Sequence, residues 1–178
     1  RVAYDKLNVD DRSAVTNLSV LEQYEAEIDA MIKALRPAPI KVVTFKADDL
    51  QLETYDTTVT ENGFTLVGTA DKSMSRKKAV VTFTHGDDTY TTAYGLSVGG
   101  KASFGSNRYV SFQVEGHCTI TIAVQSSSKT EARVLTMVDS SGATVGSFEA
   151  GTSVTLTSVD IAEAGTYSVG SAGSGMYI

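Results

Sequence analysis

Residue types that commonly carry catalysis are few in this chain of 178 residues. It has two histidines, His85 and His117, and one cysteine, Cys118. His85 precedes a Gly-Asp-Asp turn, and His117 lies one position away from the inward residues of its predicted strand, so both are expected to face solvent. Cys118 alternates with Ile120 and is expected to be a small buried thiol. No nucleophile elbow is visible, and the pattern predicts a protein that is not an enzyme.

Paired carboxylates are the next residues with chemical capacity, and they occur at Asp10-Asp11, Asp48-Asp49 and Asp87-Asp88. Adjacent residues of a strand point to opposite faces, so these pairs do not supply the facing carboxylates of a glycosidase. Oxygen-rich loops also bind calcium, but the D-x-D-x-D spacing is missing. Turn and cap roles explain the pairs. No cofactor is predicted, and a structural calcium at Asp48-Asp49 or Asp87-Asp88 stays an open alternative.

The charge distribution is more informative than any catalytic motif. The net charge of −6 argues against general binding of nucleic acid. Residues 72–133 nevertheless hold eight basic residues against four acidic ones, between two acidic flanks. Such a block could meet an acidic glycan through charge-assisted hydrogen bonds. The alternative is that these basic residues are dispersed over the surface and serve solubility.

Aromatic residues give the second indication of a ligand. Saccharide-binding surfaces commonly stack a ring on a sugar face, and tyrosine must serve here because the chain has no tryptophan. Tyr90, Tyr94 and Tyr109 are the tyrosines that could point outward. Combined with the basic block, they give a candidate ligand-binding set of seven residues: Lys77, Lys78, Tyr94, Lys101, Arg108, Tyr109 and Arg133.

The elements that must position these residues change in kind at Pro37-Ala38-Pro39. Residues 1–36 contain no glycine, and two prolines so close together cannot continue a helix. Apolar residues at three- and four-residue steps predict a helix over 19–35, with shorter helical pieces at 1–7 and 10–15. The stripe of that helix is expected to be buried, against those pieces or against a bundle upstream. We therefore predict a helical spacer over 1–37 and a β-rich module over 38–178.

After the prolines, the hydrophobic period changes from 3.6 to 2. Short alternating segments separated by glycine-rich turns predict an antiparallel β-sandwich of the jelly-roll or immunoglobulin-like kind. No apolar run approaches the ~20 residues of a membrane-spanning helix, so no membrane insertion is expected. The predicted strands cover 40–45, 63–68, 79–84, 89–98, 108–115, 117–125, 133–138, 144–148, 154–156, 166–169 and 176–178.

Two resemblances accompany these patterns. Tyr4-Asp5-Lys6-Leu7, Val15-Thr16-Asn17-Leu18 and the following Leu-Glu helix resemble a helical linker repeat of very large surface proteins of Gram-positive bacteria. The rest of the chain is similar to the β-sandwich carbohydrate-binding modules attached to bacterial pectate lyases and other polysaccharide-degrading enzymes. Segments that carry this second resemblance include 62–66, 94–100, 108–114, 118–122, 133–135, 139–142, 165–167 and 171–178.

The resemblances imply an extracellular protein, secreted or attached to the cell wall, with covalently linked neighbouring domains. Together with the basic block, they predict a non-catalytic module that binds a polysaccharide or other glycan, plant-type or from a host, and acidic in the manner of pectin. The alternative is a structural or adhesive stalk module without a glycan ligand. Binding is favoured if Lys101, Arg108 and Tyr109 lie on one face or rim, and the stalk is favoured if they scatter.

Overall fold

The computed structural model describes residues 18–35 and 43–178. The chain divides into two compact units, Arg1–Val43 and Thr44–Ile178. The predicted helical pieces at 1–7 and 10–15, and the predicted boundary at the two prolines, lie outside the described residues.

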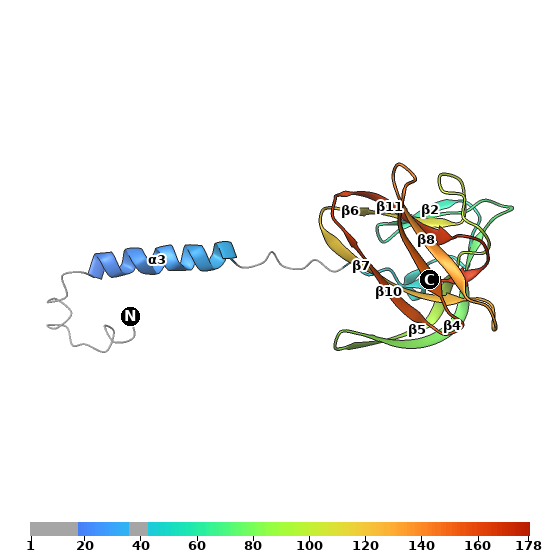
Figure 1. Cartoon of the computed structure of the whole chain (residues 1–178), viewed down its shortest axis with the longest axis horizontal. Helices are drawn as coiled ribbons and strands as arrows, with labels where there is room; N and C mark the ends of the chain where they lie inside the picture. Colours follow the sequence, from blue (N-terminus) through green and yellow to red (C-terminus); the bar gives the residue numbers. More distant parts are fainter. Residues whose placement is uncertain (1–17, 36–42) are drawn as a thin grey trace. The chain divides into compact units, whose positions relative to one another are not determined.

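Helix α3, Leu18–Leu35, is the described element of the first unit, and it confirms the helix predicted over 19–35 (Figure 1). Five residues of its apolar stripe are each at least 40 % exposed: Val20, Leu21, Tyr24, Ile28 and Met31. The segments against which the stripe was expected to pack lie outside the described residues. Among the described helices, none combines the length and the apolar character needed to cross a membrane.

The second unit consists of two antiparallel sheets of six strands each (Figure 1). The first sheet has the order β1-β4-β5-β12-β7-β10, and the second has the order β2-β3-β6-β11-β8-β9. The strands of the first sheet are β1 (Thr54–Tyr55), β4 (Met74–His85), β5 (Asp88–Ser97), β7 (Cys118–Ser126), β10 (Thr155–Ile161) and β12 (Met176–Tyr177). Those of the second are β2 (Thr58–Glu61), β3 (Phe64–Val67), β6 (Tyr109–Val114), β8 (Arg133–Asp139), β9 (Thr144–Ala150) and β11 (Gly165–Ser171).

Most of the predicted strands are confirmed, with ends that differ by a few residues, and β4 and β10 are longer than predicted. The prediction of a strand over 40–45 is wrong for its described residues, because 43–46 are not in a strand. There Phe45 packs on Phe64 with ring centroids 5.0 Å apart, and the chain then turns into the short 3-10 helix η1, Ala47–Asp49. Strands β1 and β2, which are short and rich in threonine, were not predicted.

One hydrophobic core lies between the strands of both sheets. Leu96 and Val98 come from the β5 side, and Leu66, Leu135 and Met137 come from the second sheet; all are fully or almost fully buried. Tyr167 begins the buried row of β11 and its hydroxyl donates to the Glu163 carbonyl, 3.0 Å away, in the turn from β10. Alternation along the strands places these residues inward, as the two-residue period requires.

The chain crosses repeatedly from one sheet to the other, and three of the connections meet at one end of the strands. We call these connections the crossover loops: residues 98–108 (β5 to β6), 127–132 (β7 to β8) and 172–175 (β11 to β12). The Ala102 amide donates to the Ser171 carbonyl at 2.8 Å, and the Ser127 amide donates to the Gly175 carbonyl at 3.2 Å. Residues distant in sequence are thereby held side by side.

Candidate functional site

Arg108 ends the first crossover loop and its side chain lies against Gly99 and Gly100. Its backbone is in the left-handed region, with φ at 59°, and its amide donates to the Val67 carbonyl at 2.6 Å. A Cβ on Gly99 would lie 3.0 Å from Arg108 Nε, and one on Gly100 would lie 2.8 Å from Arg108 Nη1. The two glycines therefore leave the space that the guanidinium group occupies.

Arg133 begins β8 and reaches across to the third crossover loop. Its Nη1 donates to the Gly175 carbonyl and, at 2.8 Å, to Ser127 Oγ. The Gly175 carbonyl also accepts from the amide and the hydroxyl of Ser127. Arg133 thus ties the second and third crossover loops together, and part of its donor capacity is used within the fold.

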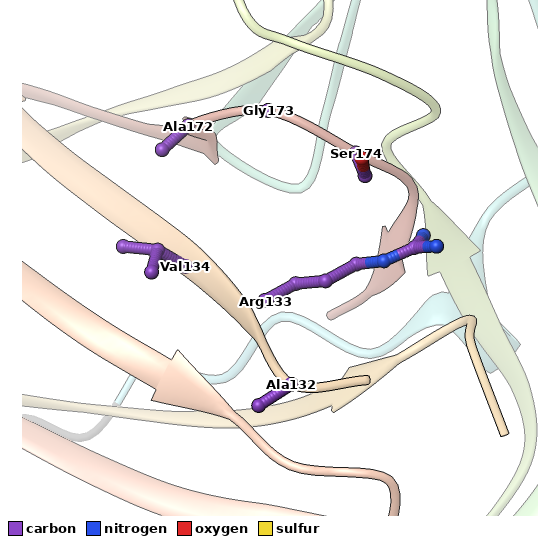
Figure 2. A pocket seen from close by; sticks show the side chains of 6 residues that line it. All are labelled: Ala132, Arg133, Val134, Ala172, Gly173 and Ser174. Atoms are coloured by element: carbon purple, nitrogen blue, oxygen red, sulfur yellow. The ribbon is translucent and has the colours of Figure 1, made fainter. Parts of the chain in front are cut away.

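A shallow hollow of about 270 Å³ adjoins Arg133 at this end of the unit. Small side chains line it, and the stem of Arg133 passes along one side while its guanidinium group points away from Val134 and Ala172 (Figure 2). The lining residues are Ala132, Arg133, Val134, Ala172, Gly173 and Ser174.

Lys101 belongs to the same end, because it follows Gly100 in the first crossover loop, and its side chain is exposed. Three members of the predicted set, Lys101, Arg108 and Arg133, are therefore on or beside the crossover loops. Within the part of the chain that the structure describes, none of the three forms an ion pair with a carboxylate.

The two tyrosines of the predicted set differ in their placement: Tyr109 directly follows Arg108 beside the first crossover loop, whereas Tyr94 lies within β5. Tyr109 packs beside Phe104, with ring centroids 5.8 Å apart, and alternates with Val110, which points into the core. Tyr94 packs against the core cluster, and the guanidinium carbon of Arg76 lies 4.5 Å from the centre of its ring. The two rings consequently lie in different environments, and Arg76 covers one face of Tyr94.

Lys77 and Lys78 lie on β4, opposite Gly95 and Tyr94 of β5, rather than in the crossover loops. Both are exposed. The pairing between β4 and β5 shifts between Lys78 and Val81, which marks a β-bulge. Because β1 pairs only with Met74 and Ser75, the rest of β4 is a free edge, where lysines and bulges are typical devices against pairing with another sheet.

The residues considered for catalysis or metal binding lie apart from one another. His117 is exposed, as predicted, and so is His85, whose Nε2 lies 3.4 Å from Thr121 Oγ1. The free thiol Cys118 is half-buried and packs against the core cluster. In the described ranges, no group of three or more histidine, cysteine, aspartate or glutamate side chains is placed to hold a metal ion.

The paired aspartates have structural surroundings. Asp48 accepts hydrogen bonds from the amides of Ala93 and Tyr94, at 2.8 to 3.1 Å, so its carboxylate is engaged at the edge of β5. Asp87 and Asp88 lie exposed at the tip of the β4–β5 hairpin, which the green ribbon in Figure 1 shows.

Sequence reasoning missed the roles of the glycines and of Arg76. The sequence shows Gly99 and Gly100 only as part of a glycine-rich segment between two predicted strands, and it gives no sign that they make room for the Arg108 side chain. Arg76 donates to the Leu50 carbonyl at 2.6 Å and covers Tyr94, contacts that join segments far apart in the sequence. To predict these contacts, one would need to know which strands lie beside one another, and no local pattern in the sequence gives this.

Comparison with the models of known protein families finds no match, and comparison with curated protein sequences finds no significant similarity.

Proposed function

We propose that this protein is a non-catalytic carbohydrate-binding module with a β-sandwich fold, belonging to a secreted or cell-surface multimodular bacterial protein. Two sheets around one core support the sandwich. The hydrogen bond from Tyr167 to the Glu163 carbonyl supports an immunoglobulin-like topology, because a tyrosine corner of this kind is a mark of such domains.

The gathering of Lys101, Arg108 and Arg133 at the crossover loops is the observation that carries the glycan proposal. A cationic end without carboxylate partners among the described residues suits an acidic polysaccharide of the pectin type. Its ligand binds at the surface, so the sugar chain contacts the loops without entering an enclosed cavity. The tyrosines contribute less than the basic residues, because Tyr109 packs on Phe104 and Tyr94 has one face covered by Arg76.

Affinity electrophoresis against homogalacturonan, xylan, β-glucan, starch and mucin glycans tests the proposal. We expect homogalacturonan to retard the protein at low salt, and added salt to weaken this retardation because charge contributes to binding. Lys101→Ala is expected to weaken binding by about 2- to 5-fold, the effect of one exposed charge contact. Lys46→Ala is the matched control, since Lys46 is an exposed lysine outside the crossover loops.

A second candidate function, a structural or adhesive stalk module, is favoured by one specific observation. Arg133 donates hydrogen bonds to the Gly175 carbonyl and to Ser127 Oγ, and so it stabilises the crossover loops whether or not a ligand binds. If none of these glycans retards the protein at low salt, the result would support the stalk function. Release of reducing or unsaturated sugar ends by the pure protein would instead decide for an enzyme.

A further inference from the structure

Arg108 differs from the other half-buried arginines of the β-rich unit in having no acceptor. Arg76 donates to the Leu50 carbonyl, and Arg133 donates to the Gly175 carbonyl. The Arg108 side chain makes no hydrogen bond or ion pair with any residue in 18–35 or 43–178, and its Nε is shielded from solvent. The Nε atoms of Arg76 and Arg133 are likewise shielded and without an acceptor, so the difference lies in the Nη groups: those of Arg108 are not shielded, and they are the donors that an acceptor from outside the chain can reach.

The backbone around Arg108 has a conformation that leaves space for its side chain. Arg108 has a positive φ of 59°, which is uncommon for a long side chain, and Gly99 also has a positive φ, 67°. Any residue with a Cβ at Gly99 or Gly100 would approach the guanidinium nitrogens to about 3 Å. The fold thus accepts a strained residue and two glycines in order to hold this guanidinium group between the crossover loops.

The local charge favours an anion. Lys101 follows Gly100 directly, and Arg133, at the start of β8, donates to the Gly175 carbonyl of the third crossover loop. Glu131 is the one acidic residue in the sequence of the crossover loops, and it forms no ion pair with these three cations. A guanidinium group presents its donors in a planar fork that matches the two oxygens of a carboxylate or of a sulfate ester.

We propose that Arg108 is the receptor for an oxyanion carried by the saccharide, either a uronate carboxylate or a sulfate ester. This inference rests on the proposed glycan-binding function and names the chemical group that the site recognises. Lys101 adds attraction at the rim, and Arg133 positions the loops that enclose the site. Neutral glycans, and uronates whose carboxylates are methyl-esterified, lack the group that Arg108 binds.

The first test compares polygalacturonate, the same polymer fully methyl-esterified, a neutral galactan and a sulfated galactan by affinity electrophoresis. We expect the carboxylated or the sulfated polymer to bind, and these two arms identify the oxyanion. Arg108→Gln should weaken that binding by about 10-fold or more, because a charged hydrogen-bonding partner is lost. Arg108→Lys keeps the charge without the fork and should retain only part of the affinity.

The second test reads the site directly in the unaltered protein, so it stands even if the variants do not fold. In a ¹⁵N-labelled sample, the Nε–H signal of Arg108 should shift on addition of trigalacturonate or inorganic sulfate and not on addition of methyl-esterified trigalacturonate. Polygalacturonate binding that is equal in the folded Arg108→Gln variant, or an Nε–H signal that neither anion moves, would overturn the assignment while leaving glycan binding intact. A signal that moves with sulfate, in a protein that no glycan retards, would support the oxyanion site and refute the glycan function.

Discussion

At the scale of single residues, Asp139 shows how one side chain organises a turn. Its Oδ1 accepts from the amide and hydroxyl of Ser141, at 2.8 and 2.6 Å, and from the Ala143 amide at 3.0 Å. The hydrogen bond from the Ser141 hydroxyl is the main reason that the pKa of Asp139 lies below its ordinary value of 3.8, and the backbone amides add to it. The ionised form therefore stabilises the turn between β8 and β9.

A dependence on pH follows from the direction of this shift. Because the pKa is lower in the folded state, the stabilisation is present above about pH 5 and is lost as the pH falls through 3.8 toward the folded-state pKa. Asp139→Asn should have a lower urea midpoint than the wild type at pH 7. At pH 3 the difference between the two midpoints should be smaller, because the wild-type carboxylate is then partly protonated. Asp87→Asn, at an exposed turn position, is the control. A constant difference between Asp139→Asn and wild type from pH 7 to pH 3 would refute the assignment.

At the scale of elements, the β4–β5 hairpin depends on a contact from outside the sheet. Its pairing is irregular between Lys78 and Val81, and the amides of Ala93 and Tyr94 donate to the Asp48 carboxylate instead of to another strand. Helix η1 thereby completes the β5 edge beside the place where β12 pairs with β5. Residues 43–46 are not in a strand, and this contact links the segment before β1 to the sheet.

Asp48→Ala should lower the free energy of unfolding by about 1–3 kcal/mol, since two strand amides lose a charged acceptor. Urea denaturation measures the loss. Asp49→Ala is a close control, because Asp49 is the exposed neighbour whose side chain accepts none of these hydrogen bonds. Equal effects of the two substitutions would show that the Asp48 contact does not support the hairpin.

At the scale of the whole β-rich unit, the two sheets share one core. Leu135 of β8 is fully buried in that core, whereas the adjacent Val134 is 40 % exposed. The same core receives Leu96 and Val98 from the first sheet and its loop. The buried residues of both sheets belong to this single core, so the two sheets are expected to unfold together.

Leu135→Ala should destabilise the unit by about 2–5 kcal/mol, the usual cost of a cavity left by a buried leucine. Val134→Ala should cost about 1 kcal/mol or less, because its side chain keeps much of its contact with water. Urea unfolding followed by far-ultraviolet circular dichroism and by tyrosine fluorescence should give one coincident transition for each variant. Two separated transitions would contradict a shared core.

Local alternation in the sequence was sufficient to predict the strands that have one apolar face and one polar face. Val110, Phe112 and Val114 alternate with polar residues, and the same period places Cys118 toward the core and His117 in solvent. The alternation predicts which side of a strand is buried because each residue reverses the direction of its side chain. It does not show whether a neighbouring strand is available, and for this reason residues 43–45 were wrongly expected to be in a strand.

The sequence by itself determined the helix, most strands and the presence of a basic block. Only the tertiary structure decided which basic residues meet, because the chain changes sheet between most consecutive strands and brings residues 99, 108, 133 and 175 to one end. It also placed Tyr94 within β5 against Arg76, and Tyr109 against Phe104 of the first crossover loop. The physical reason is that charge and periodicity are local properties of the chain, whereas the contacts of a guanidinium group depend on the order of strands in both sheets.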